Sequence, residues 1–125
     1  MPKRKINEFA KLLIKEVRDK AIENCDSYLD PDGNDAQSKR WHEELKTSSP
    51  LAFAKIVISD CVDDVIFQLL YAIDDGMLPL IFKAKDGTEV DLEKDGEGEM
   101  AGEYITTDGW RAKYSNQRFF DDFAD

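Results

Sequence analysis

Acidic side chains at alternate positions are the feature of this chain best suited to chemistry or binding. Every odd position from 89 to 99 carries a carboxylate, in the order Glu89, Asp91, Glu93, Asp95, Glu97 and Glu99. Successive side chains of a strand point to opposite faces, so this spacing predicts a row of carboxylates on one side of a strand or hairpin. Such a row can attract a cationic protein surface, hold a metal ion, or simply keep that face solvated.

A second group of carboxylates lies on a predicted helix. Asp60 and Asp64 are four residues apart and share a face, and Asp74 and Asp75 stand at the end of the same helix. Helix carboxylates can hold a magnesium ion that positions and polarises a phosphate. These four residues support a metal-dependent phosphohydrolase as an alternative function. The polar edge of an amphipathic helix would carry the same acids, and a magnesium site also needs ligands from a second helix.

Other catalytic patterns are absent from the sequence. The single histidine, His42, lacks the second histidine of an HExxH motif. Ser59 and Cys61 flank Asp60, but neighbouring helical residues point apart and cannot act as a nucleophile with its base. The glycines lie in predicted turns and form no phosphate-binding loop. We therefore predict no catalytic residue and no cofactor, and favour a non-enzymatic role.

The charge balance narrows the choice of partner. The chain has 125 residues and a formal net charge of −10, although residues 1–20 carry seven Lys and Arg against three acids. Nucleic acid is excluded as the expected partner, because phosphate binding needs a basic surface. No apolar run is long enough to span a bilayer, and no signal-peptide core follows the first residues, so we expect a cytoplasmic protein without membrane contact. Cys25 and Cys61 fall in helical apolar patterns and are expected to be buried thiols.

The first 76 residues are predicted to be mainly helical. Apolar residues recur at three- and four-residue steps from about residue 4 to 29, which is typical of an amphipathic helix. A shorter helix is predicted over 35–46. Ser49 and Pro50 begin a third, central helix with a wide apolar face, and Gly76 can end it in the left-handed conformation.

After Gly76 the apolar period changes from helical to twofold. Three Asp-Gly turns, at 85–87, 94–96 and 107–109, predict an antiparallel meander. A three-residue loop at 85–87 places Phe82 opposite Val90 and Lys83 opposite Glu89, and a similar loop at 107–109 places Tyr104 opposite Ala112. The middle loop sets acids against acids, so residues 94–98 form either a tight turn or a longer loop.

These elements predict one α+β domain over residues 1–125. Two long helices and a shorter one pack on a three- to four-stranded antiparallel meander at 77–115, and a short terminal helix at 116–124 closes the fold. Ser115 is expected to cap this terminal helix, which packs its phenylalanines back on the body.

The leading functional hypothesis is an acidic protein-binding module that neutralises or regulates a basic protein. The comparison with immunity-type inhibitors of basic toxins rests on size and charge alone. The expected partner-binding residues are Asp91, Glu93, Glu97, Glu99 and, if exposed, Tyr104. A structural or oligomeric subunit is the third alternative, and the basic residues 3–5 could bind the acidic row of a second copy to form a homodimer.

Overall fold

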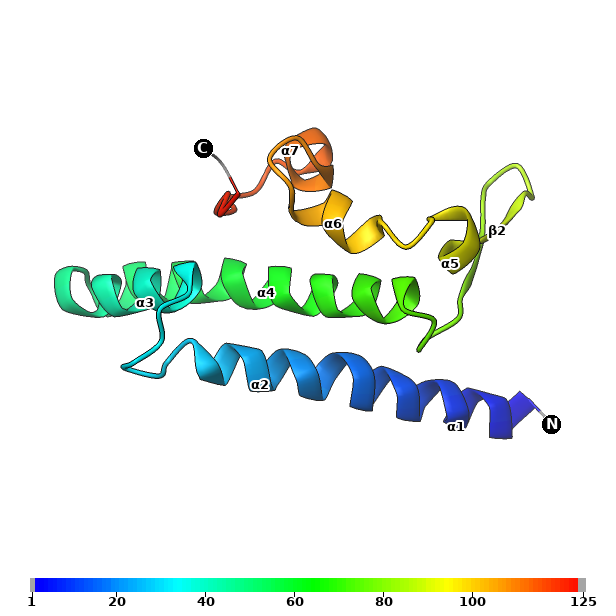
Figure 1. Cartoon of the computed structure of the whole chain (residues 1–125), viewed down its shortest axis with the longest axis horizontal. Coiled ribbons are helices and arrows are strands. Elements are labelled where there is room, and N and C mark those ends of the chain that lie inside the picture. The colour runs from blue at the N-terminus through cyan, green and yellow to red at the C-terminus, as the bar shows by residue number, and fades with distance from the viewer. Residues whose placement is uncertain (1, 124–125) are drawn as a thin grey trace.

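The computed structural model describes residues 2–123, apart from the side chains of residues 2–4 and 9. Three helical layers run alongside one another: the amino-terminal helices, the central helix α4 with α3 beside it, and the short carboxy-terminal helices (Figure 1). The elements, in chain order, are α1 Pro2–Leu13, η1 Ile14–Arg18, α2 Asp19–Ser27, α3 Ala36–Thr47, α4 Pro50–Asp74, β1 Ile81–Lys83, β2 Glu89–Asp91, α5 Leu92–Asp95, α6 Met100–Ile105 and α7 Trp110–Tyr114.

The three helices predicted for the first 76 residues are present. The first helix is a continuous run of α1, η1 and α2, in which η1 is a π-helical turn. At the start of α4, Ser49 Oγ accepts a hydrogen bond from the Ala52 N–H at 3.2 Å, and Pro50 occupies the first turn. Gly76 follows the end of α4 with φ +77°, a conformation that favours glycine. The sequence therefore carried enough local information to place α4.

The first hairpin has the predicted register, but the predicted meander is wrong. Phe82 pairs with Val90 and Lys83 with Glu89 across antiparallel β1 and β2. Within residues 2–123, however, the sheet contains only these two strands. The chain becomes helical at Leu92 because Asp91 Oδ1 accepts from the Lys94 N–H at 3.2 Å and Asp95 Oδ2 accepts from the Asp91 N–H at 3.0 Å. These local bonds satisfy the backbone that a third strand would otherwise have paired.

The second predicted hairpin is replaced by two short helices. Residues 107–109 connect α6 to α7, where the Gly109 N–H donates to Thr106 O at 2.9 Å, so Tyr104 does not pair with Ala112 across a sheet. The predicted terminal helix is also absent from residues 115–123, which cross back towards α4 without regular structure, and residue 124 lies outside the described residues. Arg118 holds this segment by donating from Nε and Nη2 to Lys55 O at 3.1 and 2.9 Å.

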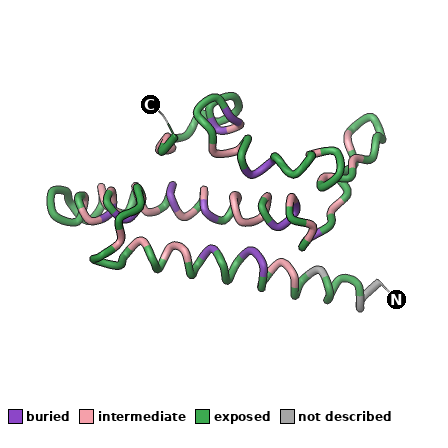
Figure 2. The backbone as a smooth tube through the Cα atoms, viewed as in Figure 1, coloured by how far each residue is buried: buried purple, intermediate pink, exposed green. Residues whose placement is uncertain are grey.

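The buried core is small and lies mainly near the carboxyl end of α4. Its central cluster consists of Val17, Ala72, Ile73, Leu78 and Met100. Buried positions are few and separated along the tube in Figure 2, and most of the chain is exposed. Within the described residues, no helix combines the length and apolar character needed to cross a bilayer.

Candidate functional site

The alternating acids do not form one strand face. Glu89 and Asp91 lie in β2, Glu93 and Asp95 lie in α5, and Glu97 and Glu99 follow in the turn before α6. All six are exposed. We call residues 89–99 the acidic segment. It forms a strand, one helical turn and a second turn in succession, so its carboxylates are spread around an exposed edge of the molecule (Figure 1).

The sequence left open whether residues 94–98 form a tight turn or a longer loop, and the structure answers this. Gly96, Glu97 and Gly98 form the turn after α5, in which the Glu99 N–H donates to Gly96 O at 3.1 Å. Residues 94–98 therefore form neither a tight turn nor a longer loop of a hairpin, because Lys94 and Asp95 end α5 and no strand follows them within the described residues. The direct opposition of acids that a tight hairpin would have required is therefore avoided.

The carboxylates of the acidic segment carry uncompensated charge. No ion pair joins any of the six to Lys or Arg among the residues whose side chains are described, even though Lys83 stands opposite Glu89 in the sheet. Asp91 and Asp95 are engaged by backbone N–H groups at the start of α5. Glu89, Glu93, Glu97 and Glu99 are exposed, and the Glu93 carboxylate lies beside Gly76.

Tyr104 is not part of the acidic segment, and its hydroxyl is engaged within the chain. It belongs to α6, is half-buried, and donates its hydroxyl to Asp63 Oδ1 at 2.6 Å. Burial, and then the bond to Asp63, raises the pKa of Tyr104 above its ordinary value. Its side chain therefore helps to hold α6 on α4. Tyr104 was expected to bind a partner only if exposed, and it is half-buried.

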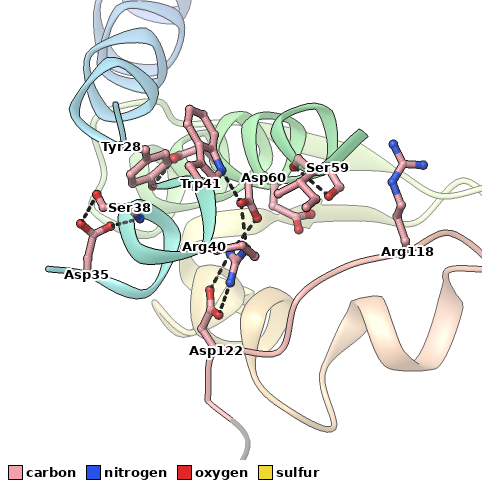
Figure 3. A network of polar contacts seen from close by, with 12 residues as sticks. Tyr28, Asp35, Ser38, Arg40, Trp41, Ser59, Asp60, Arg118 and Asp122 are labelled. Atoms are coloured by element: carbon pink, nitrogen blue, oxygen red, sulfur yellow. Dashed lines mark hydrogen bonds and ion pairs between the residues drawn. The ribbon is translucent and has the colours of Figure 1, made fainter. Parts of the chain in front are cut away.

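Asp60 forms the centre of the most extensive polar network. Arg40 of α3 donates to it from Nε at 3.1 Å and from Nη2 at 2.9 Å, and Trp41 Nε1 donates at 2.7 Å (Figure 3). Arg40 also donates to Asp122 at 2.8 and 3.3 Å, with its guanidinium 4.1 Å from the Phe120 ring centre. Burial opposes ionisation of Arg40, but the bonds to Asp122 and Asp60 prevail and raise its pKa. Asp60 thus ties α3 and the carboxy-terminal segment to α4.

The two neighbouring acids of α4 bind other elements. Asp64 accepts from the Tyr28 hydroxyl and from Asn24 Nδ2, the latter at 3.3 Å. Asp63 accepts from Arg111 Nη1 at 2.7 Å, in addition to the Tyr104 hydroxyl. Three closely spaced acids therefore point to three different neighbours, namely α3 from Asp60, the α6–α7 layer from Asp63, and the α2 end from Asp64.

The four residues of the phosphohydrolase alternative do not converge. Asp60 and Asp64 face α3 and the end of α2, whereas Asp74 Oδ1 and Oδ2 accept from the N–H groups of Met100 and Ala101 at 3.2 and 2.8 Å. Asp75 is exposed. Among the residues whose side chains are described, no group of three His, Cys, Asp or Glu side chains is placed to hold a metal ion. The α4 carboxylates instead act as ties between helices.

The two cysteines face each other from α2 and α4 and are half-buried, not fully buried as expected. Burial raises the pKa of both thiols, and the neighbouring thiol adds to this effect at Cys25. A raised pKa keeps each thiol protonated at neutral pH, and only the thiolate is a strong nucleophile. The pair therefore offers little nucleophilic reactivity.

Sequence reasoning missed the cationic and aromatic partners of the α4 acids. The sequence did not show that Arg40, Arg111 and Tyr28 bind these acids. The available signal was the presence of three closely spaced acids on a largely apolar helix. Comparisons with protein-family models, with curated proteins and with solved structures found no match. The functional proposal therefore rests on the geometry and charge described above.

Proposed function

We propose that the chain is a non-enzymatic binding protein whose acidic segment captures a basic surface of a protein partner and neutralises or regulates it. The observation that carries this proposal is the group of exposed carboxylates in residues 89–99 that have no cationic partner among the described side chains. The acids of α4 provide the contrast, because Asp60 and Asp63 are matched by Arg40 and Arg111.

The net charge of −10 supports electrostatic steering of such a partner. Opposite potentials raise the rate of encounter, and salt screens them, so capture should weaken as ionic strength rises. A cytoplasmic location forms part of the proposal and would keep Cys25 and Cys61 reduced. Nucleic acid is not the expected partner, because phosphates would be repelled by the same carboxylates.

The test is a tagged pull-down at low and high salt with two charge-matched variants. The first variant reverses the four carboxylates of the acidic segment that accept no hydrogen bond among the described residues: Glu89→Lys, Glu93→Lys, Glu97→Lys and Glu99→Lys. It leaves Asp91 and Asp95 in place, so the start of α5 is preserved. The control variant reverses four exposed acids on other elements, Glu23→Lys, Asp32→Lys, Glu43→Lys and Asp108→Lys, and changes the net charge by the same amount.

The proposal predicts a basic partner that is captured by the wild type and the control variant at low salt, and is lost from the acidic-segment variant. High salt should weaken capture by the wild type. Equal capture by the acidic-segment variant and the control would show that overall charge, and not the acidic segment, attracts the partner. Capture of no basic protein by the wild type at low salt would also contradict the proposal.

A further inference from the structure

The central helix α4 has an apolar face that the rest of the chain leaves open. Leu51, Ile58, Val62 and Val65 recur at helical spacing and are 69, 55, 54 and 43 % exposed. We call these four residues the α4 face. A helix that is apolar around most of its circumference is normally buried on all sides. Here η1 and α2 pack against one side of α4. Helices α3 and α6 pack against other sides, and the α4 face remains open.

Two apolar grooves flank the α4 face. One has a volume of about 620 Å³ and lies between α4 and α7, where Trp110 and Tyr114 line it together with Ile58 and Val62. The other has a volume of about 530 Å³ and lies between α4 and the first helical layer, where Ile14 and Ile22 line it together with Val65. The α4 face is therefore an apolar ridge with a groove on either side.

The surface area is larger than a compact monomer of this mass should expose. The chain exposes 8924 Å². A folded monomer of 14.3 kDa is expected to expose about 6,800 Å². The excess of roughly 2,000 Å² exceeds the roughly 800 Å² that each partner contributes to a standard interface. A dimer that buries the α4 face and its flanking grooves would bring the exposed area closer to that of a compact fold.

We propose that the α4 face is a homodimer interface, in which α4 of a second copy packs antiparallel across a two-fold axis. The spacing of the apolar residues identifies a second copy as the occupant. Leu51 and the half-buried Leu69 are equidistant from position 60, as are Ile58 and Val62. An antiparallel pairing about that position sets Leu51 against Leu69 and Ile58 against Val62 in both halves, as an isologous interface requires. Val65 then stands opposite the exposed Lys55, and Leu69 also packs against the core of its own chain.

The charge distribution also permits this pairing. The acids of α4 point to neighbours within the chain, where Asp60 binds Arg40, Asp63 binds Arg111, and Asp64 accepts from Tyr28. The α4 face itself contains no carboxylate. Two copies of net charge −10 still repel each other at long range. Salt should therefore strengthen the dimer, whereas it should weaken capture of a basic partner by the acidic segment.

Sedimentation of the full chain at micromolar concentration tests the interface. The proposal predicts a dimer for the wild type and a monomer for Ile58→Glu/Val62→Glu, with the dissociation constant raised at least about 100-fold because four carboxylates would be buried at the axis. Leu45→Glu/Ile81→Glu is the matched control, since both residues are similarly exposed on other elements, at 57 and 60 %. Circular dichroism checks that each variant is folded. A monomeric wild type, or a dimer that persists in the Ile58→Glu/Val62→Glu variant, would overturn the proposal.

Cross-linking tests the register in a background of Cys25→Ala and Cys61→Ala. Chains carrying Ile58→Cys are mixed with chains carrying Val62→Cys and oxidised with glutathione disulfide. The antiparallel register predicts that the mixed 58–62 disulfide forms in excess over either symmetric product. Symmetric products in excess would contradict this register. Because the acidic segment takes no part in either experiment, failure here leaves the proposed capture of a basic partner unaffected.

Discussion

At the residue scale, the surroundings of each carboxylate determine whether it stabilises the fold or remains exposed to solvent. Asp60 has a side chain that is 5 % exposed and is paired with Arg40, whose side chain is 14 % exposed. Glu89 and Glu99 are exposed, and their carboxylates accept no hydrogen bond from the residues that the structure describes. The same residue type therefore serves two purposes, and burial with a cationic partner distinguishes them.

Neutralising Asp60 should destabilise the fold strongly. Asp60→Asn leaves part of the Arg40 charge and the Trp41 N–H without their ionised partner in a buried site, at a cost of about 3 kcal/mol in the free energy of unfolding. Asp122→Asn is the matched control, because Asp122 binds the same arginine with a side chain that is 23 % exposed, and it should cost about 1 kcal/mol. Urea denaturation measures both values. Equal losses would mean that burial of Asp60 does not set its contribution.

Alkaline pH should weaken the ties made by Tyr28 and Tyr104. Burial, and then a hydrogen bond to Asp64 or Asp63, raises the pKa of each phenol above the ordinary value of 10.0. An acid with a raised folded-state pKa contributes its full stability below the unfolded pKa and loses it as the pH rises through the folded pKa. We expect the free energy of unfolding to fall as the pH rises above about 10. Ultraviolet titration of tyrosinate should show one fewer late step in Tyr28→Phe and in Tyr104→Phe, and unchanged titration curves would contradict this account.

The sequence could not predict which side chains would pair with one another across the fold. The pairing of Asp60 with Arg40 joins positions 20 residues apart, and that of Asp63 with Arg111 joins positions 48 apart. Such contacts depend on how helices pack, and local periodicity does not encode packing. The acids themselves were recognisable, but their division into buried and free groups required the fold.

At the scale of helices and strands, predictions from local sequence were correct where one interaction dominated. The cap of α4 at Ser49 and the register of β1 and β2 were both predicted, because each depends on residues close in sequence. The prediction of further strands was wrong, because the alternating acids after Asp91 have two competing uses. An alternating pattern fits a strand, but Asp91 and Asp95 bond the backbone of a helical turn.

The turn after α5 should be stabilised by a glycine at position 97. Glu97 has φ +56°, in the left-handed region that a side chain disfavours. Glu97→Gly removes this strain, and after the entropy lost by glycine it should raise the free energy of unfolding by about 0.5–1 kcal/mol. Glu93→Gly, inside α5, is the control and should lower it. Thermal denaturation compares the two, and a destabilised Glu97→Gly variant would contradict the strain assigned to this turn.

The docking of α6 on α4 should depend on Asp74. Its carboxylate accepts from the N–H groups of Met100 and Ala101, which have no partner within the first turn of α6. Asp74→Ala should therefore cost about 1–2 kcal/mol in the free energy of unfolding. Asp75→Ala is the control, because Asp75 is exposed and its side chain makes no hydrogen bond among the described residues, so its loss should be within about 0.5 kcal/mol. Similar effects of the two substitutions in urea denaturation would refute the capping role of Asp74.

The whole molecule is an open, layered fold with its charge and its apolar surface on different elements. The acidic segment runs from β2 to the residue before α6, and the α4 face lies along the first two-thirds of the central helix. Composition predicted the negative charge and the helical first half. It did not predict that α4 would remain partly uncovered, because an apolar helix pattern is the same whether its cover comes from its own chain or from another.

The effect of salt concentration on binding distinguishes the acidic segment from the α4 face. Capture through the acidic segment is an attraction between opposite charges and should weaken with salt, whereas association through the α4 face brings together two chains of charge −10 and should strengthen. The charge-reversal variant and the Ile58→Glu/Val62→Glu variant should therefore impair different activities. Each variant serves as a folded control for the other.

The most direct measurement is the rate at which the captured basic partner associates with the wild type, the acidic-segment variant and the charge-matched control over a series of salt concentrations. The account predicts a rate constant for the wild type that falls steeply with salt, a control that keeps most of that rate, and an acidic-segment variant that is slow and nearly independent of salt. An acidic-segment variant that associates as fast as the control at low salt would contradict the claim that residues 89–99 are the binding surface.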